Sequence, residues 1–162
     1  MASIQRIART ILRRLRDARG DALVEFALVA PLLFLVLFGV VDFGKAFNYW
    51  LDENHLAAQG ARLAAVNNVA PGNCPDGTTP GSLQAYIKCN ADTSELLNNA
   101  TVCVSFPNSG LKKVSNPVTV SVSTSYTWLP IIGSVLGAST TSIAGSATMR
   151  LEADSTLTAG CT

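Results

Sequence analysis

The strongest constraint in this sequence is an apolar run near its start. From Phe26 to Val41 the chain carries no charge, and Glu25 is the single charge between Ala22 and Val41. A helix of about 20 apolar residues crosses the ~30 Å hydrocarbon core of a bilayer, and Pro31 is tolerable within it. A carboxylate costs about 2.5–3.5 kcal/mol at the centre of a membrane helix and less near the interface. We therefore expect residues 22–44 to span a membrane, with Glu25 as a candidate functional residue.

Basic residues are concentrated before this run. Half of the 12 lysines and arginines precede Gly20, opposed there by Asp17: Arg6, Arg9, Arg13, Arg14, Arg16 and Arg19. Such a cluster fits nucleic-acid binding, but basic residues beside a membrane helix hold that end in the cytoplasm. We therefore expect a cytoplasmic N-terminus, an exported remainder and no nucleic-acid partner. The alternative is a cleaved secretory signal, for which Val41-Asp42-Phe43-Gly44-Lys45 is a poor cleavage site.

All four cysteines follow the apolar run, at Cys74, Cys89, Cys103 and Cys161. An even number in an oxidising compartment predicts two disulfides, with three connectivities to choose from. We favour Cys74–Cys89, which closes a short loop, and Cys103–Cys161, which ties down the end of the chain. The cysteine spacing matches no zinc pattern and there is one histidine, so we expect no metal and no other cofactor.

Two periodicities divide the remaining residues. Apolar residues recur at three and four from Phe43 to Ala65, which predicts that the helix continues to about Asn67, with Asp52 and Glu53 on its solvated side. Later segments alternate in steps of two, which predicts strands with one buried face, at 102–106, 118–128 and 142–151. Short helices are expected at 82–88 and after a capping box at 92–95. The apolar segment 129–136 fits either a buried loop or a patch facing a membrane or a partner.

These patterns predict an α+β fold in which a long N-terminal helix packs against a small antiparallel sheet of about three strands. Residues 1–20 fit either an amphipathic helix on the membrane surface or a basic leader that is later removed. Residues 21–69 form the long helix, and residues 70–162 an extracytoplasmic, disulfide-bearing α+β domain. A helix of nearly fifty residues is about 70 Å long, at a rise of ~1.5 Å per residue. Because one small globule cannot cover that length, part of the helix must lie in lipid or against neighbouring copies.

The sequence gives no indication of catalysis. It lacks a phosphate-binding loop, a Gly-x-Ser-x-Gly motif and a His-Glu-x-x-His motif. His55 has no catalytic partner pattern and is expected at the surface, while Arg62 fits a solvated helix face. We therefore expect a chain that is the substrate of an enzyme and not an enzyme itself.

The residues around Gly20 resemble the processing site of type IV prepilins, in which a basic leader ends in glycine and a glutamate follows at the fifth mature position. Cleavage after Gly20 leaves Asp21 first, Glu25 fifth and Phe26 sixth. More narrowly, residues 20–66 resemble the TadE-like pseudopilins of the tight-adherence (Flp) pilus system. The matching residues are Gly20, Glu25-Phe26-Ala27-Leu28, Pro31-Leu32-Leu33, Gly39, Asp42-Phe43-Gly44 and Gly60-Ala61-Arg62-Leu63-Ala64-Ala65.

This resemblance implies a type IV pilin-like fold and a minor pilin that takes part in pilus assembly and surface adhesion. It implies cleavage between Gly20 and Asp21 by a prepilin peptidase, and pairing of Glu25, beside Phe26, with the N-terminal amine of another subunit. The implied partners are the major pilin, other pseudopilins, an inner-membrane assembly platform and membrane lipid. The implied location is the bacterial inner membrane, single-pass, with the C-terminal domain in the periplasm, and further the pilus or cell surface.

Two other functions compete with this reading. One is an uncleaved, single-pass anchored binding module such as an adhesin, suggested by the β-rich cysteine-bearing region and the segment 129–136. The other is a pseudopilin of a type II secretion system, against which Asp42-Phe43-Gly44 and Gly60-Ala61-Arg62 argue.

Overall fold

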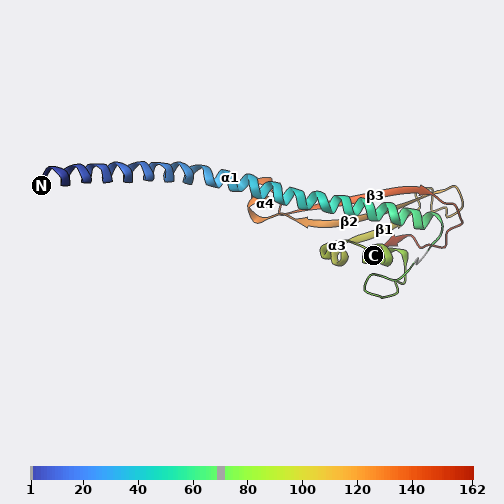
Figure 1. The fold of residues 1–162 in the computed structure, drawn as a ribbon. Helices are drawn as coiled ribbons and strands as arrows, with labels where there is room; N and C mark the ends of the chain where they lie inside the picture. Colours follow the sequence, from blue (N-terminus) through green and yellow to red (C-terminus); the bar gives the residue numbers. More distant parts are fainter. Residues whose placement is uncertain (1, 69–71) are drawn as a thin grey trace. The chain divides into compact units, whose positions relative to one another are not determined.

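The computed structural model describes residues 2–68 and 72–162, with side chains from Gly20 onward. The chain divides into two compact units, Met1–Val41 and Asp42–Thr162, each described by itself below. Helix α1, Ala2–Ala65, contributes to both units (Figure 1). The side chains of the leader arginines and the predicted boundary between residues 69 and 70 lie outside what the structure describes.

Helix α1 is continuous through the predicted leader and through Pro31. It ends at Ala65, two residues before the expected end at Asn67, and the local backbone explains why. Asn67 has a left-handed φ of 55°, and its N–H donates to the Ala64 carbonyl at 3.1 Å. The N–H of Asn68 donates to the Leu63 carbonyl at 2.9 Å. Asparagine tolerates this conformation better than most residues, so it terminates the helix in place of glycine.

In the first unit the apolar side chains of α1 face outward. Large apolar residues are exposed along the whole run, with Leu28 at 76%. Soluble proteins rarely leave a contiguous apolar surface of this extent uncovered. Within the described residues, Gly20–Ala65 is the one helical stretch long and apolar enough to cross a membrane. The helix is therefore consistent with the predicted single-pass membrane anchor.

The second unit contains a four-stranded antiparallel sheet in the order β3-β2-β1-β4. Its strands are β1 (Thr101–Ser105), β2 (Pro117–Thr127), β3 (Thr140–Arg150) and β4 (Gly160–Cys161). The predicted α+β fold is confirmed, with β4 added to the three expected strands. The segment 129–136 is not the loop offered as one interpretation, because most of it forms helix α4 (Pro130–Leu136).

Two short helices precede the sheet near their predicted positions. Helix α2 (Leu83–Cys89) is capped by Ser82, whose side chain accepts a hydrogen bond from the Ala85 N–H. Helix α3 (Ser94–Asn99) is capped in the same way by Thr93, which accepts from the Leu96 N–H. Each cap satisfies a backbone donor that the first helical turn leaves without a partner.

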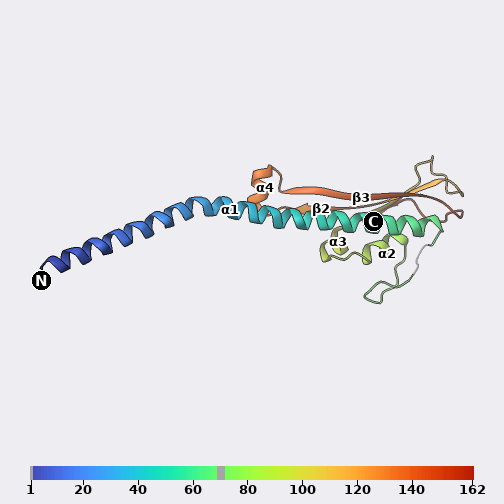
Figure 2. The ribbon, with the colours of Figure 1, turned by 45° about the horizontal axis from the view of Figure 1, so that its top comes forward.

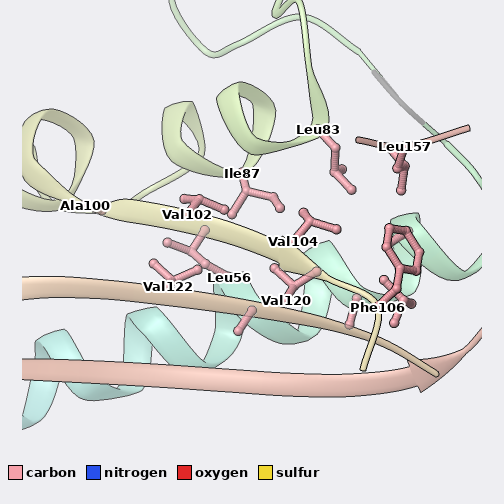
Figure 3. Packing of buried hydrophobic residues seen from close by; sticks show 14 of the residues in the cluster. Leu56, Leu83, Ile87, Ala100, Val102, Val104, Phe106, Val120, Val122 and Leu157 are labelled. Carbon is pink, nitrogen blue, oxygen red and sulfur yellow. The ribbon is translucent and has the colours of Figure 1, made fainter. Parts of the chain in front are cut away.

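The core lies between one face of the sheet and the three helices α1, α2 and α3. Leu56 of α1 and Ile87 of α2 lie close to the inward-facing valines of β1 and β2 (Figure 3). Val102 pairs with Val122 and Val104 with Val120, so these four side chains share one face of the sheet. Figure 2 shows α2 and α3 beside α1.

The opposite face of the sheet is polar. It carries serine and threonine at successive register positions, such as Ser121 opposite Ser146 and Ser125 opposite Ser142. The hydroxyls of Thr119 and Thr148 lie 2.7 Å apart across β2 and β3. Because the valines of β1 and β2 lie on the other face, the helices cover one side of the sheet and leave the second side to solvent.

Candidate functional site

The four residues of the predicted processing and assembly site lie on adjacent turns of α1 in the first unit. Gly20, Asp21, Glu25 and Phe26 are all exposed. A Cβ added at Gly20 would meet nothing within 4 Å, so packing in the described chain does not require glycine there. Asp21 and Glu25 are four residues apart and therefore share one helix face. The segment thus presents an accessible glycine and two acids at the start of the exposed apolar run.

The second unit begins with a buried carboxylate, Asp42, directly after that run. The Tyr126 hydroxyl donates to Oδ1 of Asp42, and the Leu129 N–H donates to its Oδ2 at 2.9 Å. Asp42 is buried, so these two donors replace the water that the carboxylate loses. The carboxylate therefore fixes the end of β2 and the start of α4 to one position on α1.

Aromatic rings surround this hydrogen-bonded group. Tyr126 packs edge-on against Tyr49 and against Trp128, with ring centroids 5.3 Å and 5.0 Å away. Phe43 also packs against Trp128, with ring centroids 5.8 Å apart. Burial raises the pKa of the Tyr126 hydroxyl, and the hydrogen bond to Asp42 raises it further, so the hydroxyl keeps its proton and remains a donor.

Asp52 and Glu53 are buried, so the prediction that they lie on a solvated helix face is wrong. Oδ2 of Asp52 accepts a hydrogen bond from the Asp92 N–H at 3.2 Å. Within the described residues, neither carboxylate oxygen of Glu53 has a partner with hydrogen-bond geometry. Burial raises the pKa of Glu53 to about 7, although the nearby Thr124 backbone lowers it in part. Burial also raises the pKa of Asp52.

Glu53 is buried because α1 approaches the sheet at a glycine. A Cβ on Gly145 of β3 would lie 2.5 Å from the Asn54 nitrogen and 2.6 Å from the Glu53 carbonyl carbon. A second close approach occurs at Gly60 of α1, where a Cβ would lie 2.5 Å from Cδ1 of Ile87 and 3.0 Å from Cγ1 of Val120. The two glycines therefore set how closely the helix and the sheet can pack.

Both disulfides have the connectivity that the sequence analysis favours. Cys74 pairs with Cys89, and Cys103 pairs with Cys161. The first bond joins the loop before α2 to the end of that helix. The second joins β1 to β4, where Cys103 and Cys161 are register partners in the sheet. The disulfides therefore stabilise the outer part of the second unit, on the side of the sheet away from β3.

Other residues singled out from the sequence lie at the surface. His55 is exposed and its Nε2 lies 3.1 Å from Nε2 of Gln59, and Arg62 is exposed on α1, both as predicted. In the described part of the chain, no group of three or more histidine, cysteine or acidic side chains is arranged to hold a metal ion. No local pattern in the sequence predicts the structural role of Asp42 or the burial of Glu53, although Gly145 within an alternating strand is a signal of close backbone approach.

Comparison with known proteins finds a match for part of helix α1. Residues 20–62 match the family model described as TadE-like protein. No curated protein and no solved structure matches the chain significantly. The matched segment includes Gly20, Glu25, Asp42 and Gly60, which are residues that carried the resemblance in the sequence. The predicted resemblance to TadE-like proteins is therefore confirmed over residues 20–62.

Proposed function

We propose that this chain is a minor pilin, or pseudopilin, that a prepilin peptidase processes and that takes part in tight-adherence pilus assembly and surface adhesion. One observation carries the proposal. Gly20 and Glu25 stand directly before an exposed, charge-free helix, inside the segment that matches the TadE-like family. The family match supports a role in the pilus system, and the order of these residues supports the processing step.

Cleavage between Gly20 and Asp21 removes six arginines from the end of the membrane helix. Those charges hold that end at the cytoplasmic surface, so their loss lets the helix move in the membrane. The mature chain then begins with a helix whose first turns carry Asp21 and Glu25. Acids are favourable there because the N-terminal end of a helix carries a partial positive charge.

Glu25 acts in assembly. Its carboxylate directly precedes the charge-free apolar segment, where an ion without a partner has a high free-energy cost. The amine released at Asp21 is a cation in the same surroundings, and pairing the amine of one subunit with Glu25 of its neighbour relieves both costs. This pairing also fixes the stagger between adjacent helices.

The proposal places the protein in the bacterial inner membrane, with the N-terminus in the cytoplasm and the second unit in the periplasm, and then in the pilus or at the cell surface. Its partners are the peptidase, the major pilin, other pseudopilins and the assembly platform of the inner membrane. We propose further that the chain has no catalytic activity of its own and serves as a substrate of the peptidase.

Intact mass of the membrane-extracted protein tests the processing step. In cells that contain the peptidase, we expect a mass that lacks residues 1–20. The Gly20→Leu variant should keep the leader. The Gly44→Leu variant is its control, because Gly44 lies on the same helix with nothing within 4 Å of an added Cβ, and it should be processed normally. A parent protein that retains the whole leader would refute the proposal and favour an uncleaved anchored module.

Sheared pili and a surface-attachment assay test the assembly step. We expect the Glu25→Ala variant to lose its leader normally, yet to be depleted from sheared pili and to reduce attachment of cells to a surface. The Asp154→Ala variant, which removes an exposed carboxylate of the second unit, should assemble as the parent does. If Glu25→Ala assembles and attaches normally, Glu25 has no role in pairing.

A further inference from the structure

Helix α4 presents an unusual surface for an exported domain. The stretch Leu129–Gly137 contains no charged residue. Ile132 and Gly133 face the domain and are buried, whereas Ile131, Val135 and Leu136 are exposed, Ile131 at 55% and Val135 at 64%. Three large apolar side chains on seven residues thus point away from the domain core.

Helix α4 is attached to the end of the membrane segment. Leu129, which precedes the helix, donates its N–H to the carboxylate of Asp42 at 2.9 Å. Asp42 directly follows Val41, the last residue of the charge-free run. The hydrogen bond and the peptide bond together keep the start of α4 close to the last residue of the charge-free run.

The surface next to α4 has the composition of a membrane interface. Phe43 and Trp128 pack together at 5.8 Å, and Phe47 packs on Trp50 at 5.7 Å one turn further along α1. Phe43, Phe47 and Trp50 are exposed. Tryptophan and other aromatic residues are enriched where a protein meets the headgroup region of a bilayer. Exposed aromatic rings and α4 therefore both belong to the part of the second unit that directly follows the charge-free run.

We infer that α4 is a second membrane contact, which lies in the interface of the lipid bilayer with Ile131, Val135 and Leu136 among the upper acyl chains. The occupant of this surface is lipid and not another copy of the chain, because covalent connection to the membrane segment brings α4 to the bilayer in every single molecule. The inference rests on the membrane anchor of the proposed function and not on peptidase cleavage. Its effect is to limit how the domain can tilt above the membrane.

A tryptophan placed on α4 tests this contact. The full chain with Trp50→Phe and Trp128→Phe, which replace both natural tryptophans, receives Val135→Trp in one variant and Val114→Trp in the other. Val114 is the matched control because it is 51% exposed and precedes β2, whereas α4 follows β2. A strand of 11 residues separates the two positions by about 35 Å. Each chain is reconstituted into phosphatidylcholine vesicles brominated near the glycerol end or near the methyl end of the acyl chains.

We expect Val135→Trp to emit at shorter wavelength, to be quenched mainly by the bromines near the glycerol end, and to be shielded from iodide in the water. Val114→Trp should be quenched by iodide and unaffected by either lipid. The Trp50→Phe chain, which keeps Trp128 in its natural place, repeats the lipid measurement without the other substitutions and should also be quenched by the glycerol-end bromines.

Three results would overturn the inference. The first is equal access of iodide to both reporter positions, and the second is the absence of lipid quenching at Val135→Trp and Trp128. The third is shielding that disappears when the protein is diluted to one chain per vesicle, because that result identifies a second copy as the occupant. Carbonate washing separates failure of the inference from failure of the anchor, since a chain that loses lipid quenching but stays with the vesicles retains its membrane helix.

Discussion

The buried carboxyl group of Glu53 makes the stability of the second unit depend on pH. The side chain is 0% exposed, and burial raises its pKa from the ordinary value of 4.5 to about 7. The folded state therefore binds the proton more tightly than the unfolded state does. The contribution of protonated Glu53 to the free energy of unfolding is fully present below about pH 4.5 and is lost as the pH rises through about 7. Glu53 lies in the part of α1 that packs on the sheet, outside the membrane segment.

The size of the effect follows from the pKa difference. One pKa unit corresponds to about 1.4 kcal/mol, so the loss of free energy of unfolding between low and high pH is at most about 3.5 kcal/mol. Relaxation of the surroundings and entry of water reduce the cost of a buried charge, and we expect about 2 kcal/mol. Glu53→Gln keeps the shape of the side chain and removes the charge. At about pH 8 this variant should be more stable than the parent by about 2 kcal/mol.

Urea unfolding of the full chain in detergent micelles, followed by tryptophan fluorescence with the disulfides intact, measures this difference. The free energy of unfolding of the parent should decrease from about pH 5 to about pH 8, whereas that of Glu53→Gln should change much less. Glu152→Gln is the control, because Glu152 is exposed and its removal should leave the pH dependence of the parent. Equal stability of the parent at both pH values, or an unchanged pH dependence in Glu53→Gln, would refute the reasoning.

Three further predictions use the same unfolding assay. Gly145→Ala should destabilise by about 2 kcal/mol because its Cβ overlaps the α1 backbone, whereas Gly81→Ala, with nothing within 4 Å, should be close to neutral; a neutral Gly145→Ala would mean that α1 lies further from β3. Asp42→Ala leaves the Tyr126 hydroxyl and the Leu129 N–H without an acceptor and should cost about 2 kcal/mol; no loss would show that water replaces the carboxylate. Replacing Cys74 and Cys89, which close a 15-residue loop, by serine should lower the free energy of unfolding by about 3 kcal/mol. Replacing Cys103 and Cys161, which close a 58-residue loop, should lower it by about 4 kcal/mol. The opposite order would contradict the dependence on loop length.

The long strands could be predicted because burial on one face imposes a period of two on their sequences. Val118, Val120 and Val122 are all buried, with polar residues between them. The shorter elements have no such signal. Helix α4 has seven residues with Pro130 and Gly133 among them, too few to establish a helical period. Strand β4 has two residues, and its place depends on pairing with β1 and on a disulfide.

The candidate functional residues likewise divide into those with a local sequence signal and those whose role depends on distant partners. Gly20 and Glu25 could be identified because their signal is linear: a glycine, an acid and an apolar run follow one another along the chain. The role of Asp42 depends on partners 84 and 87 residues away, which no local pattern reveals. The sequence predicts Glu53 on the solvated face because a charge between apolar positions is usually exposed. The missing side chain at Gly145 changes that outcome by letting the helix backbone approach the sheet.

The small side chains on α1 also affect how the domain folds. The face of α1 that packs in the core includes Ala57, Ala61 and Ala64, and its partners are strands that begin at Thr101. Contacts between segments so distant in sequence form slowly, because a long loop must close first. Until the strands arrive, these three positions expose methyl groups beside Leu56, so other unfinished chains meet less hydrocarbon than a row of large apolar side chains would present. The small side chains that let α1 pack closely in the folded domain thus also reduce aggregation while the helix is still exposed to water.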